Sequence, residues 1–206
     1  MKKSGLRKKI RVILASRSPR RRDLMTRILP RASFTCVKSR IQEKARPEEP
    51  PRTFAIRMAE AKASDVAGRI RILPGQTAII MAADTVIDLD GEIIGQPRNP
   101  AHARSILVRL SGRRHRVVTG LAFIRRPGKR RIRRSVTSSV WMKKLDPKTI
   151  DEYMKARESM DKAGAYGIQG MGKRLVRKYR GSYTNIVGFP VPEIRKILRT
   201  LTRDED

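Results

Sequence analysis

A carboxylate inside an apolar stretch is the first residue of this chain whose position suggests chemistry. Asp84 follows Ala82 and Ala83 and is succeeded by Thr85 and Val86. A charge in a buried strand is costly unless it is paired, so such a group is usually bound to a partner, bound to a metal or used in catalysis. Both a structural salt bridge and a functional carboxylate fit this position.

Hydroxyl and guanidinium groups gather where a strand is expected to lead into a helix. The segment from Leu14 to Arg21 reads LASRSPRR, in which Ser18 can cap a helix and Pro19 can begin it. Helix N-termini present free N–H groups to anions, and arginine binds phosphate oxygens through paired hydrogen bonds. A phosphate could therefore bind here. A plain N-cap beside solvated arginines is the alternative.

A glycine-rich segment near the C-terminus combines flexible backbone with functional side chains. The run from Asp161 to Gly170 reads DKAGAYGIQG. Glycines let the backbone approach a ligand closely. A surface turn would explain the glycines alone, but it explains less readily their mixture with Lys162, Tyr166 and Gln169.

Other residues with chemical potential give weaker signals. Glu43 and Lys62, taken singly, are unremarkable charges. His102 and His115 lie far apart without metal-ligand spacing, so structural roles are expected for both. The single cysteine, Cys36, allows no intramolecular disulfide, and the chain has no Walker lysine motif, no GxGxxG and no convincing Ser-His-Asp arrangement.

The elements that must position these groups alternate between strands and helices. Expected strands cover 11–15, 33–37, 78–89, 92–95, 117–124, 132–142 and 175–179, and expected helices cover 19–30, 52–68, 100–110, the segment after 147, and 191–201. Residues 42–51 and 160–172 are expected to be loops. This order predicts an α/β protein with a mixed sheet, built as one domain over residues 10–202 behind a basic extension at 1–9.

Six ordered segments together resemble the Maf family of nucleotide pyrophosphatases, which are related in fold to inosine triphosphatase. The resemblance runs from about Val12 to Leu198. Its anchors read LASRSPRR at 14–21, MAEAKA at 58–63, AADTV with LDGEI at 82–93, LSGRRHRVVTG at 110–120, DKAGAYGIQG at 161–170 and GSYTNIVGFP at 181–190. Matches in this order across the chain are more specific than any single motif.

The resemblance implies a fold, a reaction and a set of roles. The fold would be two-lobed, with a mixed sheet and flanking helices around a central cleft, often as a homodimer. The reaction would be hydrolysis of a nucleoside triphosphate to the monophosphate and pyrophosphate with a divalent cation, Mg²⁺, Mn²⁺ or Co²⁺. The implied triphosphate ligands are Ser16, Arg20 and Arg21, assisted by Lys62; Glu43 and Asp84 would serve the metal and the attacking water, with Asp84 as proton acceptor.

Three further positions bear on the base. The subgroup that acts on dTTP and UTP has an arginine, a threonine and a glutamine where this chain has Arg21, Thr85 and Gln169. An amide both donates and accepts hydrogen bonds, so Gln169 is suited to the imide edge of uracil or thymine. The resemblance therefore implies a pyrimidine triphosphate as substrate.

Two departures from the family pattern concern charge. The lysine usual after the LDGEI hairpin is replaced by Gln96, and the usual acidic pair in the loop is reduced to Gln42 and Glu43. A cation directed at the phosphates and one carboxylate are therefore missing. These changes bear on rate and metal affinity more than on the class of reaction.

The charge balance supports a rival from another functional class. The 206 residues carry 49 Lys and Arg against 19 Asp and Glu, for a net charge of +30. Such a field attracts polyanions, and the run from Arg125 to Arg134 holds seven basic residues in ten. The alternative reading is a basic nucleic-acid-binding protein with weak or no catalysis, although nine aromatic residues leave few stacking platforms.

The apolar stretches bear on the compartment. None approaches the roughly 20 residues that a membrane-spanning helix needs. The N-terminus has a basic flank, but its apolar segment after Val12 is interrupted at Arg17. We therefore expect a cytoplasmic protein that makes no membrane contact.

Overall fold

A seven-stranded mixed sheet forms the centre of the molecule. The computed structural model describes residues 10–128 and 130–203, so the expected basic extension at 1–9 lies outside the described residues. The strands follow the order β2-β1-β3-β5-β6-β7, with β4 paired to β3. Their bounds are β1 (Ile10–Leu14), β2 (Phe34–Cys36), β3 (Thr77–Leu89), β4 (Glu92–Ile94), β5 (Arg114–Arg126), β6 (Arg131–Met142) and β7 (Val176–Arg180).

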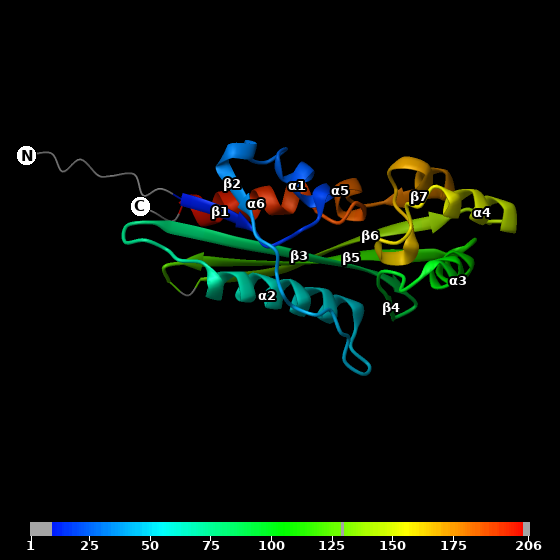
Figure 1. The fold of residues 1–206 in the computed structure, drawn as a ribbon, viewed down its shortest axis with the longest axis horizontal. Helices are drawn as coiled ribbons and strands as arrows, with labels where there is room; N and C mark the ends of the chain where they lie inside the picture. Colours follow the sequence, from blue (N-terminus) through cyan, green and yellow to red (C-terminus); the bar gives the residue numbers. More distant parts are fainter. Residues whose placement is uncertain (1–9, 129, 204–206) are drawn as a thin grey trace, which may run out of the picture.

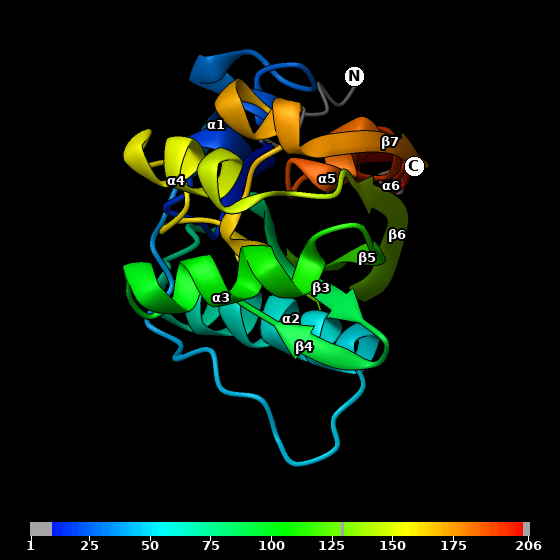
Figure 2. The same cartoon turned by 90° about the vertical axis from the view of Figure 1, so that its right-hand side faces the viewer.

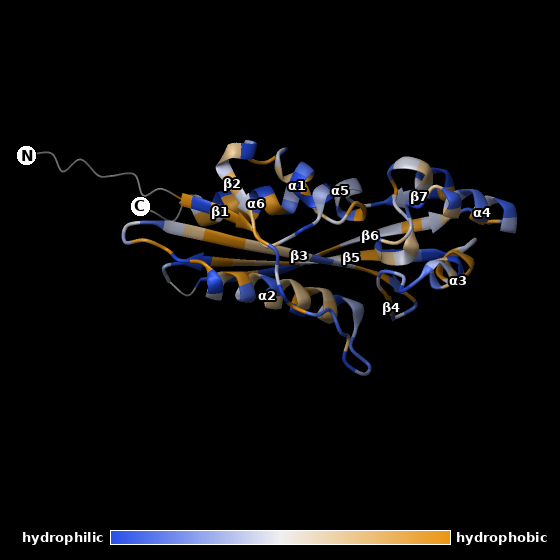
Figure 3. Cartoon of the chain, in the orientation of Figure 1, coloured by the Kyte–Doolittle hydropathy of each residue, from blue (hydrophilic) through white to orange (hydrophobic). Residues whose placement is uncertain are grey.

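Strand direction changes in the middle of the sheet. β1 runs parallel to β2 and β3, whereas β3, β5, β6 and β7 follow one another antiparallel. β3 is buried over almost its whole length, as expected of a central strand covered on both faces. Figure 3 shows broad orange segments on β3, whereas β6 is mostly pale. The predicted α/β fold with a mixed sheet is confirmed.

Helices cover the two faces of this sheet, as Figure 1 shows. Their bounds are α1 (Pro19–Met25), α2 (Pro51–Arg69), α3 (Pro100–Leu110), α4 (Pro147–Lys155), α5 (Tyr183–Ile186) and α6 (Val191–Arg203). Side chains alternate across a strand, so Met81 and Ala83 pack with α1 and α6 while Ile80 and Ala82 pack with α2. No helix among the described residues is long and apolar enough to cross a membrane.

Helix α2 lies directly on the backbone of β5 at Gly120. A Cβ atom at this position would stand 2.2 Å from the backbone carbonyl carbon and oxygen of Ala55. Real Cβ atoms do not approach backbone so closely, so only glycine permits this contact. The missing side chain therefore sets how near α2 comes to the sheet.

The structure differs from the sequence prediction in three local features. Helix α1 ends at Met25 rather than at Pro30. Turn residues at 26–28 follow the helix, and Leu29, the residue before the proline, is disfavoured in helical conformation. The glycine-rich loop contains 3₁₀ turns at Ala163–Ala165 and Gly170–Leu175. The short helix α5 was not predicted.

Candidate active site

A cleft of about 1160 Å³ opens beside the middle of β3. Its walls come from the β1–α1 loop, the segment after β2, α2, the turn after β4 and the glycine-rich loop. Residues far apart in the sequence therefore meet at one place. Every site residue that the sequence predicts lines this cleft: Ser16, Arg20, Arg21, Glu43, Lys62, Asp84, Thr85 and Gln169.

The β1–α1 loop is held by its own hydroxyl groups. Ser16 Oγ accepts a hydrogen bond from the backbone N–H of Ser18 at 3.1 Å. Ser18 Oγ accepts one from the N–H of Arg21 at 3.4 Å, as the expected N-cap of α1. The loop thus brings Ser16 and both arginines to the edge of the cleft.

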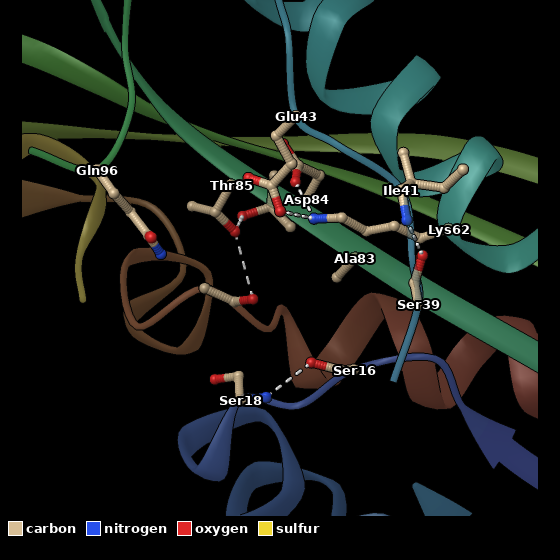
Figure 4. Close-up of polar contacts among 12 residues, drawn as sticks. Ser16, Ser18, Ser39, Ile41, Glu43, Lys62, Ala83, Asp84, Thr85 and Gln96 are labelled. Atoms are coloured by element: carbon tan, nitrogen blue, oxygen red, sulfur yellow. Dashed lines mark hydrogen bonds and ion pairs between the residues drawn. The ribbon is translucent and has the colours of Figure 1, made fainter. Parts of the chain in front are cut away.

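Lys62 lies between two carboxylates, as Figure 4 shows. Its Nζ is 2.5 Å from Glu43 Oε1 and 2.5 Å from Asp84 Oδ1. Lys62 and Asp84 are buried, whereas the Glu43 side chain is 51% exposed. Asp84 Oδ2 is buried without a hydrogen-bond partner among the described residues. One oxygen of this carboxylate therefore keeps its accepting capacity inside the cleft wall.

Burial is the main influence on the Asp84 carboxyl. It raises the pKa above the ordinary value of 3.8, while the charge of Lys62 acts in the opposite direction. The negative charge of Glu43 raises the pKa further, and Arg21 lowers it. A carboxylate whose pKa moves toward neutral pH is a stronger base than an exposed one.

Arg21 forms a polar link between α1, β3 and the turn before α6. Its Nη1 donates to the carbonyl of Ala83 at 2.7 Å, its Nε to the carbonyl of Gly188 at 3.0 Å and its Nη2 to Thr85 Oγ1 at 3.2 Å. Thr85 Oγ1 also lies 3.0 Å from Thr119 Oγ1. Burial lowers the pKa of Arg21, and the charge of Asp84 opposes this effect. Arg21 and Thr85 thus fix the backbone on both sides of Asp84.

Arg20 connects α1 to the glycine-rich loop on the other side of the cleft. Its Nη1 pairs with the carboxylate of Asp161, and its Nη2 donates to the Asp161 carbonyl at 3.0 Å. Lys162 Nζ donates to Asp161 Oδ1 at 2.7 Å. Gln96 Nε2 donates to the same Asp161 carbonyl at 3.2 Å, so this glutamine faces the cleft.

Gln169 presents an unengaged amide. It is exposed, lines the cleft and forms no hydrogen bond with another residue in the described part of the chain. Behind the same loop, His115 Nε2 and Tyr166 OH lie 2.6 Å apart in the core. Burial lowers the pKa of His115 to about 4, so the ring is neutral near pH 7. This agrees with the structural role expected for His115.

Sequence reasoning missed two partners in this site. Asp161 was noted only as part of a glycine-rich run, and the Gly188 carbonyl was not considered. Their contacts join Asp161 to Arg20 and Gly188 to Arg21 across 141 and 167 residues of sequence. Pairs this distant leave no spacing signal in one sequence. Covariation among relatives is the signal that could find Asp161.

The carboxylates at this site suit a hard divalent cation in a limited way. Among the described residues no group of three or more His, Cys, Asp or Glu side chains is placed to hold a metal. Glu43 and Asp84 place carboxylate oxygens on one wall of the cleft. Mg²⁺ is commonly bound through one or two carboxylates plus substrate phosphates and water, so the donor set fits such an ion.

Comparison with known proteins places this cleft in a family. The sequence pattern of the Maf-like proteins matches residues 11–201. The chain is 39% identical over 188 residues to the dTTP/UTP pyrophosphatase of Clostridioides difficile, covering 91% of this chain and 93% of that protein. It is 38% identical over 191 residues to that of Syntrophus aciditrophicus, covering 93% and 90%. It is 37% identical over 191 residues to that of Methanosarcina mazei, covering 93% and 94%. The chain belongs to the Maf family.

Proposed function

We propose that this protein hydrolyses dTTP and UTP to the nucleoside monophosphate and pyrophosphate. The observation that carries the proposal is the Asp84 carboxylate, buried in the cleft wall with Oδ2 unpartnered and with a raised pKa. A base so placed can take a proton from water without first breaking a strong ion pair at that oxygen. The names of relatives with 37–39% identity support the substrate class.

In this proposal the glycine-rich loop recognises the nucleobase of the substrate. The unengaged amide of Gln169 can donate to a carbonyl and accept from the imide N–H of uracil or thymine. Thr85 contributes indirectly, since its hydroxyl is bound to Arg21 and Thr119. Purine bases also present a donor beside an acceptor to an amide, so selection against them depends on the larger size of the bicyclic ring.

The triphosphate is held by the α1 side of the cleft. Ser16 and Arg20 offer a hydroxyl and a partly exposed guanidinium, and Arg21 keeps N–H groups beyond its three protein contacts. Lys62 adds a buried positive charge beside Asp84. The phosphate chain competes with Asp161 for Arg20 when it enters.

Glu43 and Asp84 are the residues that would hold a divalent cation, Mg²⁺, Mn²⁺ or Co²⁺. When bound, such an ion neutralises phosphate charge and lowers the pKa of coordinated water. In the reaction itself, Asp84 Oδ2 accepts a proton from the attacking water, whose oxygen bonds to the α phosphorus as the bridge between the α and β phosphates breaks. Arg20 and Lys62 stabilise the charge that develops on the departing pyrophosphate.

Pyrophosphate release from a panel of nucleoside triphosphates tests the proposal. We expect UTP and dTTP to be preferred over ATP and GTP with Mg²⁺, Mn²⁺ or Co²⁺. Asp84→Asn should lower kcat by about 10²-fold or more while leaving the fold intact, because shape is kept and the base is lost. Exposed Asp23→Asn on α1 is the control. Near wild-type turnover in Asp84→Asn would end the assignment.

We also propose the domain bounds, the cellular compartment, the oligomeric state and a nucleic-acid association of this protein. We place the catalytic domain at residues 10–202 and the protein in the cytoplasm, where its nucleotide substrates are made. A homodimer is expected and is checked by sedimentation. Weak association with nucleic acid is expected from the net charge of +30 and is checked by its salt dependence.

A further inference from the structure

One face of the sheet extends beyond the helix that covers it. α2 packs against β3 and against the part of β5 that includes Gly120. Figure 2 shows β6 at the margin of the molecule, beyond the layer that α2 forms. The open face therefore consists of the start of β5 with the adjoining ends of β6 and β7.

The strand register determines which side chains occupy this face. Arg116 is opposite Ser139, which is opposite Arg180, and Arg114 is opposite Trp141. Directly opposed residues of paired strands point to the same side of a sheet. Arg114 and Arg116 are even-numbered like Gly120, which faces α2, so they share its side. We call Arg114, Arg116, Ser139, Trp141, Lys178 and Arg180 the basic sheet face.

The cations of the basic sheet face are available to a partner to different degrees. Arg116 Nη2 pairs with Asp88 Oδ2 at 2.8 Å. Lys178 Nζ lies over the Trp141 ring, 5.0 Å from its centroid. Arg114 and Arg180 are exposed, and neither guanidinium group bonds to another residue in the described ranges. Two guanidinium groups thus flank a half-buried indole without a carboxylate of their own.

Described cations of the basic run from Arg125 to Arg134, by contrast, contact α2. Arg131 Nη1 and Arg133 Nη1 both pair with Glu60, at 3.7 and 3.2 Å. Arg126 donates to the Ala67 carbonyl on the same helix. Three cations of this run thus already have partners on α2, and the basic sheet face is the better candidate for a polyanion.

We propose that the basic sheet face binds single-stranded nucleic acid. Arg114 and Arg180 would pair with backbone phosphates. Trp141 would stack with a base once Lys178 moves off the ring to the adjoining phosphate. Sheet surfaces that combine cations with an aromatic side chain bind single strands in this way, largely without regard to sequence. None of these residues lines the catalytic cleft, so this binding is a separate activity and does not depend on the proposed pyrophosphatase.

Charge and polarity argue against other occupants. A second copy of the same face would bring like charges together. An anionic membrane surface would bind through several apolar side chains alongside the cations, whereas Trp141 has Ser139 and Thr137 as its neighbours along β6. A flexible polyanion with bases satisfies both the guanidinium groups and the ring.

Binding of a labelled oligonucleotide tests the proposal. We would measure anisotropy with single strands of about 12 nucleotides, within the site sizes of related surfaces, and with the matching duplex. The double variant Arg114→Gln/Arg180→Gln should bind about ten-fold more weakly, with a salt slope shallower by about 1.4. The control Lys196→Gln/Arg199→Gln removes the same charge from exposed positions on α6, across the sheet, and should change affinity less than about two-fold.

Trp141 supplies an independent readout because it is the only tryptophan in the chain. Base stacking should quench its fluorescence on titration with the single strand, and Trp141→Leu should weaken binding. Equal losses in the two double variants would overturn the proposal in favour of net charge alone. Unchanged fluorescence, tighter binding to the duplex, or binding only to vesicles of anionic lipid would overturn it as well. UTP hydrolysis should be the same in all these variants.

Discussion

Replacing Lys62 by methionine should lower the free energy of unfolding, because it leaves the buried Asp84 carboxylate without its cation. The change removes an ammonium that bonds to Glu43 and Asp84 at 2.5 Å each. Glu43 is half exposed, so its bond contributes little after solvent screening. Asp84 is 2% exposed, and removing the partner of a buried charge costs about 3–5 kcal/mol. We expect a loss of about 3 kcal/mol in the free energy of unfolding near neutral pH.

The loss should depend on pH with a definite sign. Burial already raises the pKa of Asp84, and the charge of Lys62 opposes that shift, so the variant's pKa lies higher still. The folded variant then keeps a proton that the unfolded chain releases above the ordinary value of 3.8. Its free energy of unfolding therefore falls as pH rises from there through the folded-state pKa, by up to about 1.4 kcal/mol per pH unit.

Urea unfolding at about pH 5 and about pH 8 measures both effects. Lys62→Met should lose more stability relative to wild type at the higher pH, and UTP turnover should fall with it. The double variant Lys62→Met/Asp84→Asn is the control, because an amide carries no titratable proton. Equal destabilisation of Lys62→Met at the two pH values, or the same pH dependence in the double variant, would refute the reasoning.

The other predictions concern specificity and phosphate binding. Gln169→Glu should lower kcat/KM for UTP by about ten-fold through a lost hydrogen bond to the base, and equal wild-type rates on UTP, ATP and GTP would contradict it. Gln96→Lys should raise kcat/KM about five-fold at low salt and less at high salt, while Arg98→Ala, outside the cleft, should be neutral. Asp161→Asn should lower KM for UTP by about two-fold because Arg20 is released for phosphate, at a stability cost below about 1 kcal/mol; a raised KM would count against the competition.

Much of the fold could be predicted because neighbouring residues in the sequence determine where its helices begin. Asn99 accepts from the backbone N–H of His102 at 2.8 Å, and Asp146 from that of Thr149 at 2.7 Å, each just before a proline. These caps need only neighbouring residues. Helix α5 escaped prediction because it is four residues long and its buried Asn185 bonds to the Val117 carbonyl on β5.

The candidate site could be predicted as a set of residues but not as a network. Asp84 was marked by its charge in an apolar strand, and the family resemblance supplied its neighbours. The geometry of Arg21 was not predictable, since its acceptors at Ala83 and Gly188 are backbone atoms that no side-chain pattern encodes. The pairing of Arg20 with Asp161 likewise depends on how two distant loops meet.

The absence of a side chain at Gly120 sets the distance between the helix and the strand that carry the catalytic groups. α2 carries Lys62, and β3, hydrogen-bonded alongside β5, carries Asp84. A single methyl group at residue 120 would force the helix away from the sheet at Ala55 and draw the ammonium from its carboxylate. In a natural population, we therefore expect an allele that changes this glycine to lower activity, although it alters no atom that touches a nucleotide. A library built to widen the substrate range should keep this codon fixed and place its diversity in the glycine-rich loop.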